Sequence, residues 1–148
     1  MRVRAYELGD WDAIARIHDA ARMDELRESV GTEAFLTLEQ TAANEGLFDG
    51  AVWVAEDADV VVGFVAIRGD EVTWLYVDPS RYRQGVGRTL LRHAVATGGR
   101  EVEVLDGNTA ALSLYRSEGF EVVETTIGRL AGNESFAATG HLLRKRDG

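Results

Sequence analysis

Residues 83–88 form a glycine-containing turn that could hold a phosphate group. The turn reads Arg-Gln-Gly-Val-Gly-Arg, follows a predicted strand and opens a predicted helix. The backbone N–H groups of such a turn lack helical partners and converge, and the helix dipole adds partial positive charge. Gly85 and Gly87 would let a bulky anion approach the chain, and Arg83 and Arg88 could add charge-assisted hydrogen bonds. We therefore expect a phosphate or pyrophosphate group to bind here.

Two common nucleotide-binding motifs do not fit this turn. A P-loop requires a lysine after its second glycine, but the sole lysine of the chain is Lys145. A dinucleotide fingerprint requires a third small residue where this chain has Leu90. The turn by itself can also be purely structural, so other segments must decide between these interpretations.

Asn108 and Tyr115 are a second pair of residues that could do chemistry. They lie seven positions apart in a predicted helix, so they share one helix face and are separated by about 10 Å along its axis. Both polar groups can therefore address one groove. A tyrosine on an apolar helix face is more often a core residue with its hydroxyl satisfied, and the spacing alone leaves both interpretations open.

Together the two segments resemble the GCN5-related N-acetyltransferase (GNAT) family, whose two signatures occur here in the usual order and separation. The second signature, Asn-x-x-Ala-x-x-x-Tyr-x-x-x-Gly-Phe, spans Asn108 to Phe120. The resemblance is strongest over residues 60–120. It implies an enzyme that transfers an acetyl group directly from acetyl-CoA to a primary amine of a small molecule or peptide. One departure is Tyr82, which stands where the first signature has Arg or Gln and makes Arg83 and Arg88 more important.

The resemblance also implies roles for individual residues. The coenzyme pyrophosphate would bind the backbone of the turn, which comprises Arg83, Gln84, Gly85, Val86, Gly87 and Arg88. The pantetheine arm would form β-like hydrogen bonds with the preceding strand, at Leu75, Tyr76 and Val77. Asn108 would contact the coenzyme, and Tyr115 would be the acid beside the thioester sulfur. A backbone N–H near residues 75–77 would stabilise the oxyanion.

The general base is assigned less directly. Glu103 is the first candidate, because it lies on the strand next to the coenzyme strand and matches a glutamate with this role in ribosomal-protein alanine acetyltransferases. An acidic residue in such a position is usually just solvated, and Glu71, Asp78 or a water relay are the alternatives.

Residues before position 30 offer further candidates for the acceptor site. His18 lies on the helix that borders this site in the family, but a packed, half-buried histidine is the more common case. Asp24, Glu25 and Glu28 could attract a cationic amine, although a solvated run of charges is the commoner interpretation. The other histidines, His93 and His141, offer no stronger case.

Composition excludes several other classes of function. The chain has 148 residues, no cysteine and a formal charge of −9. We expect a single N-acetyltransferase domain over residues 1–148, and neither nucleic acid nor a membrane as a partner. With no cysteine and three dispersed histidines, no metal site is predicted. The N-terminus lacks the apolar run of a signal peptide, so a cytoplasmic location is expected.

The predicted elements place these residues in a mixed α/β (α+β) domain of the GNAT fold. Hydrophobic periodicity and turn residues predict strands at Arg2–Leu8, Ala51–Glu56, Val60–Arg68, Glu71–Val77, Glu101–Leu105, Phe120–Thr126 and Phe136–Lys145. They predict helices that start after Asp10, span Glu33–Glu45, start at Gly85 and span Asn108–Glu118, with residues 20–32 irregular. The sheet should be mostly antiparallel, with flanking helices and one parallel pair in a central β-α-β unit that binds the coenzyme.

The sequence also leaves two alternative functions and one possible oligomeric assembly. An N-terminal protein acetyltransferase of the ribosomal-protein alanine type is suggested by the arrangement of Glu103, Asn108 and Tyr115. A non-catalytic acyl-CoA-binding regulatory module would need the glycine turn but not Tyr115. The last two strands could also pair across a homodimer.

Overall fold

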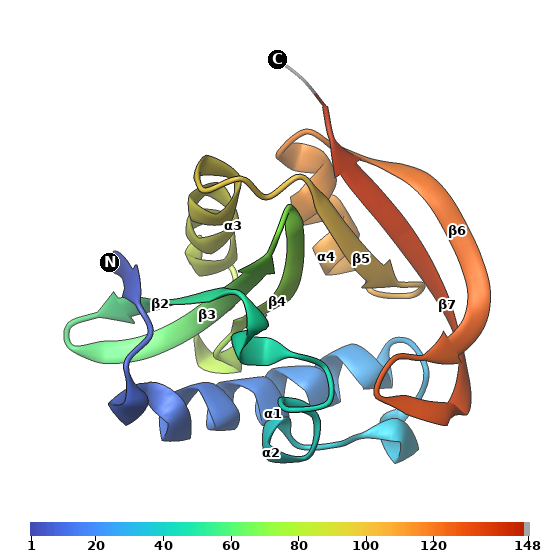
Figure 1. The fold of residues 1–148 in the computed structure, drawn as a ribbon, viewed down its shortest axis with the longest axis horizontal. Helices are drawn as coiled ribbons and strands as arrows, with labels where there is room; N and C mark the ends of the chain where they lie inside the picture. Colours follow the sequence, from blue (N-terminus) through green and yellow to red (C-terminus); the bar gives the residue numbers. More distant parts are fainter. Residues whose placement is uncertain (147–148) are drawn as a thin grey trace.

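A computed structural model describes residues 1–146, so residues 147 and 148 of the predicted domain lie outside the described part. One mixed sheet of seven strands, in the order β1-β2-β3-β4-β5-β7-β6, forms the centre (Figure 1). The strands are β1 (Arg2–Ala5), β2 (Ala51–Asp57), β3 (Val60–Arg68), β4 (Glu71–Val77), β5 (Glu101–Leu105), β6 (Phe120–Leu130) and β7 (Asn133–Lys145). The α-helices are α1 (Trp11–Arg27), α2 (Leu38–Thr41), α3 (Val86–Ala96) and α4 (Thr109–Ser117). The predicted α+β class and mostly antiparallel sheet are confirmed.

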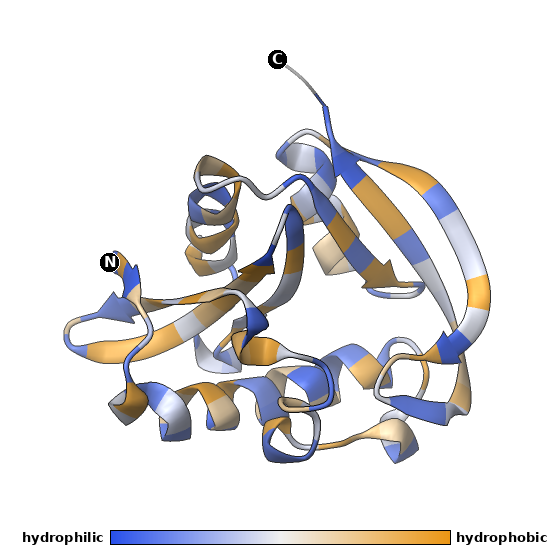
Figure 2. Ribbon diagram, in the orientation of Figure 1, coloured by the Kyte–Doolittle hydropathy of each residue, from blue (hydrophilic) through white to orange (hydrophobic). Residues whose placement is uncertain are grey.

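Helices cover the sheet on both faces. Side chains of α1 and α2 pack with Phe64 and Ala66 of β3, whereas side chains of α3 and α4 pack with Val62 and Val65 of the same strand. Neighbouring residues of β3 therefore enter different cores, which explains why this strand is apolar along most of its length (Figure 2). Gly63 lets α3 approach closely, because a Cβ there would lie 3.0 Å from a methyl group of Leu90.

The central parallel pair separates soon after it forms. β4 and β5 are paired in register only at Glu71–Glu101 and Val72–Val102, and the strands then diverge. Thr73 is an extra residue in β4, because Val72 and Trp74 on either side of it pair with consecutive residues of β3. Such a bulge bends a strand and increases its twist, which helps the two strands to part.

Among residues 1–146, the divergence leaves part of the β4 backbone without a strand partner on the side of β5. The N–H of Asp78, just after β4, donates to the carbonyl of Val62 at 2.9 Å. Because backbone groups alternate sides along a strand, the N–H and C=O of Leu75 and Val77 point away from β3 and into the opening.

The two helices predicted near the N-terminus differ from the structure. α1 continues to Arg27 through a stretch expected to be irregular, because Ala21 and Leu26 are buried and extend its apolar face. The predicted helix Glu33–Glu45 is wrong, since only Leu38–Thr41 is α-helical. This short helix begins at a capping box, in which the side chains of Thr37 and Gln40 each bind the other's backbone N–H.

The other corrections concern strand ends. β1 stops at Ala5, because residues 8–10 form a 3-10 turn. β6 and β7 are longer than the predicted strands and form a hairpin, with Ala131 and Gly132 between them. Most of β6 is exposed, so this part of the hairpin lacks the apolar alternation that would mark it in the sequence. Its tip packs Leu130 against Leu26 near the end of α1.

Among residues 1–146, no helix has the length and apolar character needed to cross a membrane.

Candidate active site

A cleft of about 410 Å³ opens where β4 and β5 part. Its wall includes three residues of α1, namely His18, Arg22 and Glu25. The sheet contributes residues of both diverging strands, and the tip of the β6–β7 hairpin closes the far side. The α1 face, the divergence and the hairpin together therefore form one open site.

The predicted phosphate-binding turn is exposed at the start of α3. Gly85 is the N-cap and has a φ of 82°, and Arg83 also has a positive φ of 63°. A Cβ at Gly85 would meet no atom within 4 Å, so the backbone conformation itself favours glycine here. In the described part of the chain, no side chain caps the helix at Gly85, which leaves its first N–H groups available to an anion.

The side chain of Arg88 is engaged within the protein. It contacts the hydroxyl of Ser117 at 3.0 Å and the carboxylate of Glu118 at 2.7 Å. Arg92 binds the same carboxylate, and the hydrogen bonds from Arg92 and Arg88 hold the pKa of Glu118 below its usual value. The Arg88 guanidinium therefore joins α3 to the end of α4, and a contact between Arg88 and the coenzyme stays a prediction.

Asn108 is the N-cap of α4, and both ends of its amide are used. Its Oδ1 accepts the N–H of Ala111 at 3.2 Å, and its Nδ2 donates to Glu25 at 3.1 Å. The preceding residue, Gly107, has a φ of 99°, and a Cβ there would lie 2.2 Å from the carbonyl oxygen of Glu28. This close approach brings the start of α4 against the end of α1. A coenzyme contact by Asn108 also stays a prediction.

Tyr115 lies in the core formed with α3, with 6% of its surface exposed. Its ring packs edge-on against Phe120, with the ring centres 5.9 Å apart. Burial, followed by the negative charge of Glu25, raises the pKa of Tyr115 above its ordinary value. The hydroxyl therefore stays protonated at neutral pH, which is the state required of a proton donor. Its role as the acid stays a prediction.

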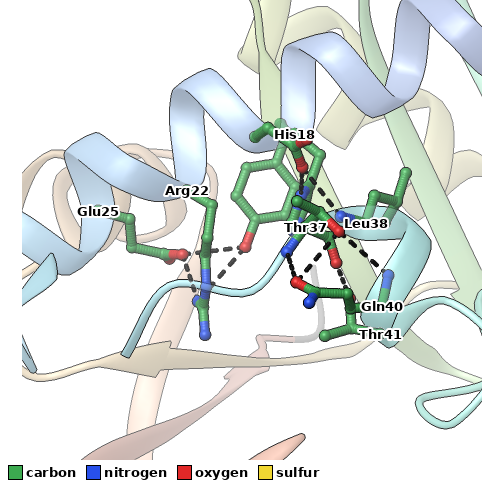
Figure 3. A network of polar contacts seen from close by, with 9 residues as sticks. His18, Arg22, Glu25, Thr37, Leu38, Gln40 and Thr41 are labelled. Atoms are coloured by element: carbon green, nitrogen blue, oxygen red, sulfur yellow. Dashed lines mark hydrogen bonds and ion pairs between the residues drawn. The ribbon is translucent and has the colours of Figure 1, made fainter. Parts of the chain in front are cut away.

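Glu25 is the centre of a polar network that the sequence did not identify. The hydroxyl of Tyr76 donates to it at 2.9 Å, Arg22 forms an ion pair with it, and Asn108 donates to its other oxygen. Figure 3 shows the Glu25 and Arg22 side chains beside each other under α1. Burial raises the pKa of the Tyr76 hydroxyl. The spacing of Arg22 and Glu25, three residues apart, is the one signal of this network in the sequence.

The other acidic candidates near the end of α1 do not line the cleft. Asp24 accepts the hydroxyl of Tyr82 at 3.2 Å and pairs with Arg27. Glu28 meets the start of α4 through its backbone at Gly107. Of the predicted acidic run, the structure thus brings Glu25 alone into the cleft wall.

His18 is a packed residue, which is the more common case for a histidine on such a helix. It is 3% exposed, its ring lies edge-on to Tyr76, and its Nδ1 lies 2.9 Å from Asp19. Burial lowers the pKa of His18 below its usual value. Asp19 also accepts the N–H of Leu38, so this cluster joins α1 to α2 (Figure 3).

The carboxylates considered as the base occupy different places. Glu103 is exposed and lines the cleft together with Glu71. Burial, and next the charge of Glu103, raises the pKa of Glu71. Asp78 does not line the cleft and instead binds Ser80 and Arg16. The structure thus keeps Glu103 and Glu71 near the site and places Asp78 outside it.

The remaining histidines are not among the residues that line the cleft. His93 packs edge-on against Trp53, and His141 lies between Thr125 and Asp106. Within residues 1–146, no group of three or more His, Asp or Glu residues is placed to hold a metal ion.

Comparisons with known proteins agree with this geometry. Residues 48–122 match the family model described as an acetyltransferase (GNAT) domain. The chain is 36% identical over 76 residues to the peptidyl-lysine N-acetyltransferase YjaB of Salmonella typhimurium, a match that covers 50% of this chain and 52% of that protein. It is 32% identical over 98 residues to YjaB of Escherichia coli, covering 62% of this chain and 67% of that protein. The first match thus spans about half the length of that relative.

Solved structures share the fold over nearly the whole chain. A ribosomal-protein-alanine N-acetyltransferase from Brucella melitensis has a TM-score of 0.71 and 25% identity, with 98% of this chain and 99% of that chain covered. The YncA structure from Salmonella typhimurium, solved with acetyl-CoA, has a TM-score of 0.68 and 22% identity, with 99% and 95% covered. With its parted β4 and β5, its glycine turn and the family match over half its length, the chain belongs to the GNAT acetyltransferase family.

Proposed function

We propose that the protein transfers an acetyl group from acetyl-CoA to a primary amine of a small molecule or peptide. The observation that carries the proposal is the unpaired β4 edge at Leu75 and Val77, which lies just before the glycine turn of α3. An extended amide-containing chain can pair with such an edge as an added strand would. A pyrophosphate suits the exposed N–H groups at the start of α3.

The donor set of the chain fits this co-substrate, which supplies an activated acetyl group as a thioester. Leu75 and Val77 would bind the pantetheine amides, with the backbone of Tyr76 between them. One of these N–H groups would also donate to the acetyl oxygen where negative charge develops. The residues from Arg83 to Arg88 would hold the pyrophosphate through their backbone.

Proton transfers would be divided between two sides of the site. On the cleft side, Glu103, alone or through water, would take the proton that the substrate ammonium must lose before the neutral amine attacks the acetyl carbonyl. On the α4 side, Tyr115 would give its proton to the departing sulfur. Burial raises the pKa of Tyr115, so its hydroxyl carries a proton at neutral pH and would release it only to a strong base such as the departing thiolate.

A lysine side chain in a peptide is the acceptor we favour. The relatives named above are peptidyl-lysine N-acetyltransferases. The open cleft has room for an alkyl chain that ends in an amine, and Glu71 and Glu103 could attract its ammonium group. The second candidate is an N-terminal protein acetyltransferase, favoured by the presence of Glu103, Asn108 and Tyr115 at their signature positions.

The test is thermal unfolding with and without acetyl-CoA, followed by thiol release in the presence of amines, lysine peptides and peptides with free N-termini. Stabilisation together with thiol release supports the enzyme, and the preferred acceptor separates the two candidates. Stabilisation without release by any acceptor favours a regulatory acyl-CoA-binding module. No stabilisation at saturating acetyl-CoA overturns the proposal.

A further inference from the structure

Arg22 is the least exposed of the three arginines that line the cleft. Its side chain is 19% exposed, compared with 49% for Arg68, and Arg129 is an exposed residue of β6. Arg68 also has Asp49 as an ion-pair partner at the surface. A guanidinium removed from solvent in this way requires partners for its N–H groups.

Only part of the Arg22 guanidinium has such partners. It carries five N–H donors. Its Nη1 contacts Glu25 and the hydroxyl of Tyr76, and within residues 1–146 no hydrogen bond uses its Nε or Nη2. Among the described side chains, the one fully buried polar atom that lacks a partner is Nε2 of His93, so the unused atoms of Arg22 are not sealed in the core. The unused edge of Arg22 therefore reaches the open cleft that it lines.

The contacts on the other edge fix the position of the guanidinium. Glu25 accepts from Tyr76 and Asn108 as well as from Arg22, so its carboxylate is held from three directions. A planar guanidinium held at one nitrogen presents the remaining N–H groups as a fork that matches a carboxylate. Because the guanidinium is already held in place, little side-chain conformational entropy is lost when a carboxylate binds.

Two carboxylates and the unused edge of Arg22 lie at different places in the cleft. Glu71 and Glu103 lie near the end where β4 and β5 still pair, with Arg68 opposite Glu71 on β3. Arg22, paired with Glu25, lies next to Tyr76. Tyr76 lies five positions after Glu71 along β4, which corresponds to roughly 16 Å in an extended strand. The cleft can therefore receive a cationic and an anionic group of one molecule.

We infer that Arg22 binds a carboxylate on the acceptor, so that the preferred acceptors are amines that also carry an acidic group. This inference rests on the proposed function, because it concerns the molecule that receives the acetyl group. The same guanidinium chemistry would suit a phosphate of the coenzyme. The experiment below separates these two sources of the anion.

The test compares peptides that differ in one acidic group. We compare kcat/KM within two pairs of peptides. The first pair is blocked and contains Lys-Glu or Lys-Gln, and the second is unblocked and starts with Ala-Glu or Ala-Gln. The exchange of Glu for Gln changes the charge with little change in size. We expect the wild type to prefer the acidic peptide of at least one pair by about tenfold, the scale of a charge-assisted hydrogen bond. Arg22→Gln should reduce this ratio to nearly one, and Arg22→Lys should give an intermediate ratio.

The matched control is Arg68→Gln, which removes another arginine of the cleft and should keep the wild-type ratio. The double variant Arg22→Gln/Glu25→Gln removes the charge pair together, and should also lose the ratio if it folds with a cooperative thermal transition. A wild-type ratio near one in both pairs overturns the inference, as does a ratio retained in Arg22→Gln. If Arg22→Gln changes only the KM for acetyl-CoA, the anion that Arg22 binds belongs to the coenzyme, and this result also overturns the inference.

Binding measurements test the inference independently of the proposed function. Calorimetry with the Nε-acetylated Lys-Glu and Lys-Gln peptides, in the presence of coenzyme A, measures recognition without turnover. A preference for the Glu peptide that is lost in Arg22→Gln supports the inference even if the wild type acetylates no peptide. The N-terminally acetylated Ala-Glu and Ala-Gln peptides are measured in the same way, and equal binding within both pairs counts against Arg22, whether or not acetyl transfer is observed.

Discussion

Tyr115 combines two properties that the sequence presents as alternatives. It is a packed core residue beside Phe120, and it carries a hydroxyl whose pKa is raised by burial and by Glu25. Tyr115→Phe keeps the ring and its packing, so we expect the affinity for acetyl-CoA to remain within about twofold. Turnover should fall by about 100-fold, the scale of general acid catalysis. Steady-state kinetics and thermal shift with acetyl-CoA measure the two quantities.

The control for this variant is Tyr6→Phe, which removes the hydroxyl of a tyrosine that packs against Phe48. It should leave turnover unchanged. If Tyr115→Phe turns over at the wild-type rate, Tyr115 is not the essential acid.

Asp10 should make the stability of the protein depend on pH. Arg4 contacts both oxygens of this carboxylate, at 2.8 and 2.9 Å, and the N–H of Glu7 adds a third hydrogen bond. The hydrogen bond from Arg4 is the main reason that the pKa of Asp10 lies below its usual value. Because the folded state lowers this pKa, the stabilisation is present above the unfolded value of about 3.9 and is lost as the pH falls through the folded value.

We therefore expect Asp10→Asn to lower the free energy of unfolding by about 1–3 kcal/mol at pH 7. The difference from the wild type should shrink below about pH 4. Urea unfolding at pH 7 and pH 3 provides the comparison. A difference of the same size at both pH values would show that the charge of Asp10 is not responsible.

The site residues that the sequence revealed differ from those it missed in how far away along the chain their partners lie. Glu103 was identified through a motif position, and the cleft lining contains it. The importance of Glu25 was missed, because its partners Tyr76 and Asn108 lie 51 and 83 residues away. A charged residue on a helix looks solvated until the elements that cover it are known.

At the scale of elements, prediction succeeded where periodicity and turn residues agreed. β4 and β5 have the predicted bounds, and α3 and α4 agree within one or two residues. The two strands predicted at Ala51–Glu56 and Val60–Arg68 form the β2–β3 hairpin, and its two turn residues, Ala58 and Asp59, both have positive φ. The bulge at Thr73 left no sequence signal, because it follows from how β4 packs between β3 and β5.

The glycine turn allows a direct test of the coenzyme site. Gly85 and Gly69 both have positive φ, of 82° and 63°, and a Cβ at either would meet no atom within 4 Å. Gly85→Val and Gly69→Val should therefore destabilise the fold by similar amounts, of about 1–3 kcal/mol. Only Gly85→Val should also lose at least tenfold in affinity for acetyl-CoA, because its side chain would occupy the space in front of the α3 N–H groups.

Gly69 is the appropriate control because it lies in the turn between β3 and β4, away from the start of α3. Calorimetry with acetyl-CoA measures the affinity of each folded variant. Affinity retained in Gly85→Val would refute the pyrophosphate assignment.

At the scale of the whole molecule, the parted strands are held open by elements from both halves of the chain. The end of α1 contacts the start of α4 through Glu25 and Asn108, and the hairpin tip packs on α1 through Leu130. The amide of Asn133 in the hairpin also donates to the carbonyl of Ala34. The opening between β4 and β5 is therefore framed by contacts within the fold itself.

This arrangement predicts a specific pattern of hydrogen exchange. In the free protein, the N–H groups of Leu75 and Val77 face the opening and should exchange faster than that of Tyr76, which faces β3. If the co-substrate pairs with this edge, acetyl-CoA should slow exchange at residues 75 and 77. Residue-resolved exchange measured by NMR gives these rates.

Binding also stabilises the whole fold, so all slowly exchanging amides should gain some protection. Amides of β1, which is distant in the sheet order from the opening, report this general effect. Protection at Leu75 and Val77 that exceeds the gain in β1 would show that the co-substrate occupies the opening. Equal gains would mean that acetyl-CoA binds without pairing with β4, and the assignment of the pantetheine arm would have to be abandoned.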